Sequence, residues 1–186
     1  MNYKEIDATA ITEINIEGNE IFQIDIETVA TKYISFESIV DGEYENEFQV
    51  VSAVVGNKIN LKLEQYSYAF IKDDKRNAHK IVAAKLILKV PEKLNLNVIS
   101  DISNVTLKGK FDALDIRLQE GYFKILGEVS EANVSTINGS IVVRTRNARI
   151  NANSSNGELE LAQFTNPRST FNLKTVNGNI SVSKME

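Results

Sequence analysis

A regular repeat organises the second half of the chain and constrains its fold more than any other feature. Gly139 marks the pattern, and the equivalent position holds Ser103, Gly121, Gly157 and Gly178. The steps between successive equivalents are 18, 18, 18 and 21 residues, the last one lengthened by an insertion in the segment FTNPRST. Because a fixed period makes every turn motif part of a repeating unit, the period must be considered before any single turn.

Each unit carries apolar residues at four fixed positions, seven and five residues before the marker and two and four residues after it. This alternation predicts two strands joined at a corner, with one face of each strand buried. Six residues before the marker stand polar residues, which either form a ladder of side chains along the stack or are ordinary outward positions: Asn97, Asp115, Asn133, Asn151 and Asn172. The twenty apolar positions are Leu96, Val98, Val105, Leu107, Leu114, Ile116, Phe123, Ile125, Ala132, Val134, Ile141, Val143, Ile150, Ala152, Leu159, Leu161, Phe171, Leu173, Ile180 and Val182.

The stretch STINGSIVV, residues 135–143, contains Asn-Gly between β-branched runs and by itself predicts a β-hairpin. A meander of hairpins has no reason to keep a constant spacing, whereas a coil that changed length would push its inward side chains out of register. We therefore predict an all-β fold, a right-handed parallel β-helix (β-solenoid) with coils of about 18 residues. In this fold Gly139 lies at a corner, beside Gly121 and Gly157.

The first half of the chain is also strand-like, but the regular register fades there. The segment around Gly18-Asn19 is expected to form an irregular coil, and residues 48–66 a true hairpin about Gly56-Asn57. We predict one domain over 1–186, in which irregular coils and hairpins of 1–90 cap the regular coils of 91–186. The last coil ends at ISVSKME and is expected to leave the other end weakly protected.

Composition excludes several classes of protein. The chain has 186 residues, no cysteine and a net charge of −4, so it offers neither disulfides nor a basic footprint for nucleic acid. No apolar run is long enough to cross a bilayer, and the chain as given begins without an export signal. We expect no nucleic acid partner and no direct membrane insertion.

The corner motifs STINGSIVV and KTVNGNISV, which follow a strand ending in Val-Pro, resemble the bacterial putative-adhesin domain family of unknown function, a β-helix family related to head GIN domains. The resemblance covers about residues 10–184. It implies a right-handed parallel β-helix, an extracytoplasmic or cell-surface location, and a role in adhesion. It supplies no catalytic residues.

Four arginines are candidate surface contacts. Arg144 and Arg146 share an outward face, Arg149 follows in the next corner, and Arg117 is expected one coil away. They would meet an anionic glycan or an acidic strand of a protein partner, and the alternative is a solvated basic stripe.

Tyr66, Tyr68 and Phe70 occupy every second position and therefore share one face of a strand. This pattern fits either a sugar-stacking stripe or packing over the end of the solenoid. Two further features do not predict metal sites. The single histidine, His79, lies in a charged loop and is expected to be solvated. The acidic segment DGEYENE alternates too regularly to form a calcium cage and is expected to be a solvated strand face. No metal or other cofactor is expected.

At the outward positions three and five residues after the marker, no two acidic residues lie on neighbouring coils. We therefore expect no catalytic residues and no enzyme activity, and the alternative is a polysaccharide-active enzyme. The sequence favours a non-enzymatic binding or adhesion module for an unidentified glycan or protein. The second hypothesis is a bactofilin-like scaffold that self-associates end to end through the C-terminal coil.

Overall fold

The computed structural model describes residues 2–41, 48–65 and 83–186, which form fifteen strands and no helix. Consequently, nothing in the described part of the chain could cross a membrane as a helix. The strands are β1 (Asn2–Asp7), β2 (Glu13–Glu17), β3 (Ile21–Thr28), β4 (Tyr33–Asp41), β5 (Phe48–Val55), β6 (Lys58–Gln65), β7 (Ala83–Val90), β8 (Asn95–Ile102), β9 (Asn104–Glu120), β10 (Phe123–Asn138), β11 (Ile141–Thr145), β12 (Arg149–Ser154), β13 (Leu159–Leu161), β14 (Thr170–Asn177) and β15 (Ile180–Lys184).

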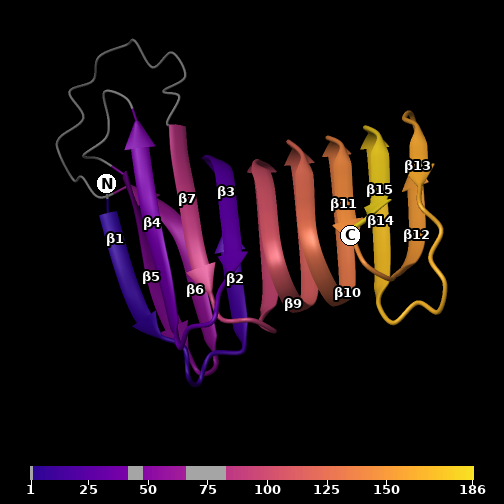
Figure 1. Cartoon of the computed structure of the whole chain (residues 1–186). Helices are drawn as coiled ribbons and strands as arrows, with labels where there is room; N and C mark the ends of the chain where they lie inside the picture. Colours follow the sequence, from indigo (N-terminus) through magenta and orange to yellow (C-terminus); the bar gives the residue numbers. More distant parts are fainter. Residues whose placement is uncertain (1, 42–47, 66–82) are drawn as a thin grey trace, which may run out of the picture.

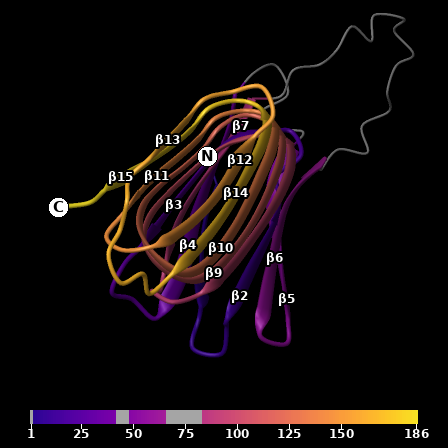
Figure 2. The same ribbon diagram turned by 90° about the vertical axis from the view of Figure 1, so that its right-hand side faces the viewer.

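The strands form one large, mostly parallel sheet that does not close on itself (Figure 1). Because β9 and β10 are long and turn a corner, the sheet has two walls, seen as layers on either side of the interior in Figure 2. The β13 wall runs β1-β4-β7-β3-β9-β10-β11-β15-β13. The β12 wall runs β5-β6-β2-β8-β9-β10-β14-β12 and uses the second halves of β9 and β10.

The register of the repeat appears directly in the pairing of the strands. In β9 and β10, Val105 lies beside Phe123 and Ile116 beside Val134, and β11 continues the row with Ile141. Of the twenty predicted inward positions, sixteen are buried. The other four, Ile150, Ala152, Leu159 and Leu161, all belong to the unit formed by β12 and β13, because that unit ends the stack.

The order of the units differs from the order in the sequence, and this corrects the prediction that Gly157 lies beside Gly139. β14 lies between β10 and β12, and β15 between β11 and β13, so the last unit is inserted before the penultimate one. The connection 162–169 must therefore lead from the end unit back into the stack, which accounts for the longer last step of the repeat. The C-terminal unit is interior, and the exposed end is formed by 149–161.

A similar insertion occurs in the first half of the chain. β2 pairs with β6 and β8, while β3 pairs with β7 and β9, so the first unit in the sequence is second in space. The predicted hairpin about Gly56-Asn57 is confirmed, with Val55 opposite Lys58 in antiparallel β5 and β6. Antiparallel β1 and β4 complete the edge of the β13 wall.

The Asn138-Gly139 stretch is a corner and not a hairpin, as predicted. The backbone N–H of Gly139 donates to Asn177 O at 3.0 Å, and that of Gly121 donates to Asn138 O at 3.1 Å. A Cβ on Gly139 would lie 1.7 Å from Gly121 O. Close approach therefore requires glycine at position 139, whereas a positive φ, of 110°, occurs at the equivalent Gly121.

Hydroxyl groups complete these corners. Thr136 and Thr175 are buried, and their Oγ1 atoms donate to Gly139 O at 2.8 and 3.0 Å. Ser154 Oγ donates in the same way to Gly178 O at 2.7 Å. The carbonyl oxygens of Gly139 and Gly178 are thereby satisfied.

Candidate functional site

A column of asparagine side chains crosses the outer face of the β12 wall. Strand pairing places seven residues side by side on seven consecutive strands, because each occupies the outward position between two inward-facing apolar residues. We call them the asparagine column. In spatial order they are Asn60, Asn15, Asn97, Asp115, Asn133, Asn172 and Asn151.

At the β12 end, neighbouring amides of this column hydrogen-bond to one another. Asn151 Nδ2 donates to Asn172 Oδ1 at 2.8 Å, and Asn172 Nδ2 donates to Asn133 Oδ1 at 2.8 Å. The side-chain ladder considered from the sequence is thus present in this part of the column. Such ladders hold the side chains in register along the stack.

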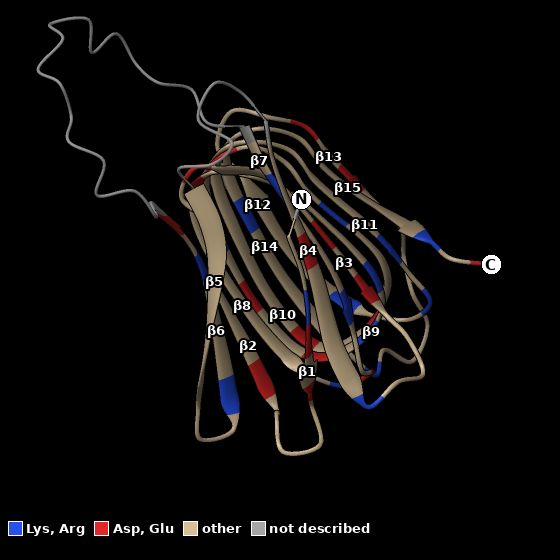
Figure 3. Ribbon diagram, turned by 90° about the vertical axis from the view of Figure 1, so that its left-hand side faces the viewer, with Lys and Arg blue, Asp and Glu red and all other residues tan. Residues whose placement is uncertain are grey.

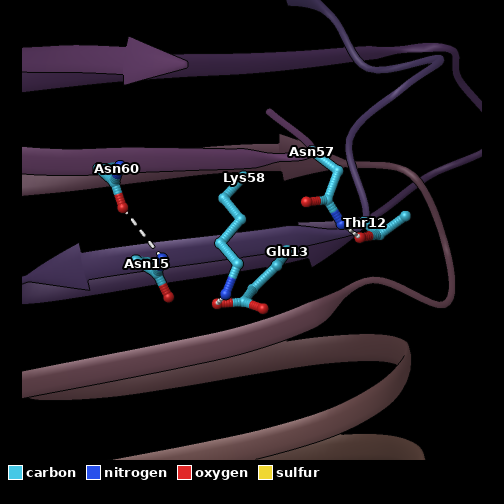
Figure 4. A network of polar contacts seen from close by, with 6 residues as sticks. All are labelled: Thr12, Glu13, Asn15, Asn57, Lys58 and Asn60. Atoms are coloured by element: carbon cyan, nitrogen blue, oxygen red, sulfur yellow. Dashed lines mark hydrogen bonds and ion pairs between the residues drawn. The ribbon is translucent and has the colours of Figure 1, made fainter. Parts of the chain in front are cut away.

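The column continues at the other end through strands outside the regular repeat (Figure 4). Asn15 Nδ2 donates to Asn60 Oδ1 at 3.0 Å. The neighbouring Lys58 Nζ lies 3.0 Å from Glu13 Oε1, and Asn57 Nδ2 donates to Thr12 Oγ1. Figure 3 shows this pairing of basic β6 with acidic β2 among the strands at that end.

An open groove lies over the asparagine column, and we call it the amide groove. Its larger part has a volume of about 640 Å³ and a smaller part about 290 Å³, and the two share Asp115 and Asn133. The polar residues that line the larger part are Asp115, Arg117, Asn133, Ser135, Asn151, Asn153, Asn172 and Lys174. Acidic Glu13 and Glu131 line the smaller part. The groove therefore offers rows of amide donors and acceptors with a basic and an acidic region.

Arg117 is held in place within the amide groove. Its Nε and Nη2 donate to the two carboxylate oxygens of Asp115 at 3.1 and 2.7 Å. Both side chains remain partly exposed, at 62% and 41%. Two-point contact of this kind fixes the plane of the guanidinium group while leaving further donors free for a ligand.

Lys62 lies on the same outer face, at the β6 end, beside Glu17 of β2. A hydrogen bond from Lys62 to Glu64, with the charge of that carboxylate, raises the pKa of Lys62. This end of the face therefore carries exposed, paired charges.

The structure does not bring the four predicted arginines together. Arg117 lies on the β12 wall, whereas Arg144 lies on β11 in the β13 wall. One and a half repeats separate the two along the chain, and the half-repeat places them on opposite walls. Arg146 follows β11 with its Nε 3.6 Å from Glu128 Oε1, and Arg149 is the first residue of β12 rather than a corner residue.

Tyr66 and Tyr68 lie outside the described residues, as do Phe70, His79 and the acidic segment 43–47. Sequence reasoning missed Lys174 and Asn153 as lining residues of the amide groove. The repeat could have revealed them, because both stand four residues before the marker, the position that Arg117 and Ser135 occupy in their units. No group of His, Cys, Asp and Glu residues suited to a metal ion occurs in the described part of the chain.

Comparisons with known proteins identify a shared architecture. Neither a family model nor a curated protein matches the sequence. Among solved structures, a putative cell adhesion protein from Clostridium sporogenes is similar with a TM-score of 0.68 at 13% identity, covering 99% of this chain and 98% of that one. A putative adhesin from Bacteroides fragilis has a TM-score of 0.39 at 12% identity, covering 99% and 96%. At these identities the first likeness shows the fold alone.

Proposed function

We propose that the chain is a parallel β-solenoid of the adhesin-like kind and a non-enzymatic binding module that acts at the cell surface. Its ligand on the β12 wall is a polyhydroxylated one, a glycan, held along the amide groove. Two kinds of support come from outside the site. They are the resemblance of the corner motifs to the adhesin domains and the shared architecture with the Clostridium sporogenes protein.

The observation that carries this proposal is the amide groove itself. Planar amides and a carboxylate recur on adjacent strands about 4.8 Å apart, and four of them line the larger part of the groove together: Asp115, Asn133, Asn172 and Asn151. A glycan carries hydroxyl groups at regular intervals, each of which donates and accepts. Because the groove is shallow and polar, affinity comes from many weak contacts rather than from deep burial.

The test is a glycan array followed by calorimetric titration of the bound glycans. Replacing Arg117 and Lys174 by alanine removes two charged groups from the amide groove. The matched control replaces Lys124 and Arg144, two exposed cations of the β13 wall. We expect the groove variant to weaken binding about tenfold or more, as loss of charged hydrogen-bond donors does, and the control to bind normally. Absence of any bound glycan, or equal losses in both variants, would contradict the proposal.

A second candidate function is end-to-end self-association, and the exposed end of the stack favours it. Leu159 and Leu161 of β13 are 45% and 39% exposed, although their equivalents elsewhere in the stack are buried. The outer edges of β12 and β13 pair with no described strand. Because the C-terminal unit is interior, the self-associating end would be 149–161 and not the C-terminal coil.

Sedimentation over a wide concentration range tests this candidate. We expect association that increases with concentration and is lost when Leu159 and Leu161 are replaced by lysine, because charges on an edge strand oppose strand pairing. A monomer at every concentration would remove the candidate while leaving the glycan proposal intact.

A further inference from the structure

A second hollow lies at the opposite corner of the stack from Asn138-Gly139, where the β13 wall turns into the β12 wall. It has a volume of about 390 Å³, and we call it the corner hollow. Phe111 and Val129 line it and are almost fully buried, at 4% and 3% exposure. The corner hollow therefore has an apolar part as well as a polar rim.

Four cationic side chains surround the corner hollow, and they come from four separate segments of the chain. Lys93 precedes β8, Lys110 follows Gly109 in β9, Arg146 follows β11, and Arg168 lies in the connection 162–169. The connection that breaks the regular spacing thus supplies one of the four cations. Only the stacking of the units brings these residues to one place.

The segment that carries Arg168 is held by hydrogen bonds. Asn147 Nδ2 donates to Asn166 O at 2.6 Å, and Ser169 Oγ donates to Asn147 O at 2.9 Å. These contacts tie both ends of the segment 166–169 to the corner after β11. Arg168 is therefore presented from a fixed backbone position.

The charges of the corner hollow are not balanced by its own acids. Asp112 and Glu128 are the carboxylates in its lining, against four cations, in a chain whose net charge is −4. Arg146 contacts Glu128, and Lys110 Nζ lies 3.9 Å from Glu92 Oε1 outside the lining.

Lys93 and Arg168 form no ion pair with any residue in the described ranges. Lys93 also has a φ of 64°, a conformation that residues other than glycine seldom adopt. The backbone conformation at position 93 favours glycine, so it does not account for the lysine there.

We propose that the corner hollow binds an anionic group, namely a carboxylate, sulfate or phosphate. Lys93 and Arg168, which form no ion pair in the described ranges, contact the anion, and Arg146 and Lys110 add charge beside it. Phe111 and Val129 lie buried at the base of the hollow. This site is distinct from the amide groove and does not depend on the function proposed for that groove.

Calorimetric titration with four probes tests the proposal: inorganic phosphate, pyrophosphate, a sulfated oligosaccharide and an oligogalacturonate. The site variant carries Arg146→Gln and Arg168→Gln. The matched control carries Lys124→Gln and Arg144→Gln, which remove the same charge from outside the corner hollow. Melting temperatures of both variants establish that each is folded.

We expect saturable binding of at least one probe, weakened about tenfold or more in the site variant and unchanged in the control. Binding of the inorganic probes would identify free phosphate as the ligand chemistry, and binding of only the oligosaccharides would identify an acidic glycan. If no probe binds at millimolar concentration, or if both variants lose affinity equally, the proposal is wrong.

Discussion

Replacing Gly139 by alanine tests the close stacking of the corners. The new Cβ would lie 1.7 Å from Gly121 O and 2.7 Å from Gly121 C, whereas real Cβ contacts are essentially never shorter than 3.0 Å. The carbonyl oxygen must therefore move by about 1.3 Å, in a backbone tied by the hydrogen bonds Gly121 N to Asn138 O and Gly139 N to Asn177 O. Overpacking costs about 1–3 kcal/mol, and weakening two backbone hydrogen bonds adds about 1 kcal/mol each.

We therefore expect Gly139→Ala to lower the free energy of unfolding by about 3–5 kcal/mol, which for a chain of this size lowers the melting temperature by roughly 6–20 °C. The control is Gly56→Ala in the β5–β6 turn, where no atom lies within 4 Å but φ is 61°. There only the left-handed backbone is penalised, at about 1 kcal/mol. Calorimetry of both variants separates the two effects. A Gly139→Ala protein as stable as the wild type would refute the stacking of these corners.

Three further predictions concern stability. Val143 is fully buried and Arg144 is exposed. Val143→Asp should therefore lower the free energy of unfolding by several kcal/mol because it buries an unpaired charge, whereas Arg144→Asp should have a small effect. Equal melting temperatures of the two variants would refute the register. Asn172→Ala removes two amide hydrogen bonds, so it should lower the free energy of unfolding measured by urea titration by about 1–3 kcal/mol. An unchanged free energy of unfolding would show that the ladder is absent. The hydrogen bond from Lys108 Nζ, with its charge, lowers the pKa of Glu27, so this pair stabilises the fold above the ordinary glutamate pKa and the effect is lost as the pH falls through the lowered value. Because the pair is exposed the effect is small, and Glu27→Gln should reduce the acid-induced loss of stability, whereas an unchanged pH profile would contradict it.

The sequence predicts the strands and their buried faces well, because the alternation of apolar residues repeats at a fixed spacing. It does not predict the order of the units. The units marked by Gly157 and Gly178 have the same pattern of apolar columns, so either could stack on the unit of Gly139. The distinguishing signals are modest. The end unit contributes the small Ala152 where the interior unit contributes Leu173, and the longer last step of the repeat marks the return of the chain.

The candidate sites could be predicted only in part. The asparagine column is visible in the repeat, but its extension to Asn15 and Asn60 depends on strand pairing that the irregular first half conceals. Arg117 is a member of the amide groove, yet its expected grouping with Arg144 fails because their spacing is a half-integral number of repeats. The corner hollow combines residues from four segments, so no local motif reveals it.

The order of the units determines where both sites form, because it places Asn172 in the amide groove and Arg168 at the corner hollow. The chain has no cysteine, so pairs of introduced cysteines report on strand neighbours without background. In the structure Ser135 lies beside Lys174, and Asn153 lies one strand further away. Neighbouring strands are about 4.8 Å apart and next-neighbours about twice that, whereas a disulfide requires Cα atoms within about 7 Å.

The decisive measurement is therefore the yield of disulfide under mild oxidation in two double variants. Ser135→Cys with Lys174→Cys is predicted to cross-link almost completely, and Ser135→Cys with Asn153→Cys is predicted to remain reduced. The reverse result would show that the units stack in sequence order and that the arrangement described here is wrong.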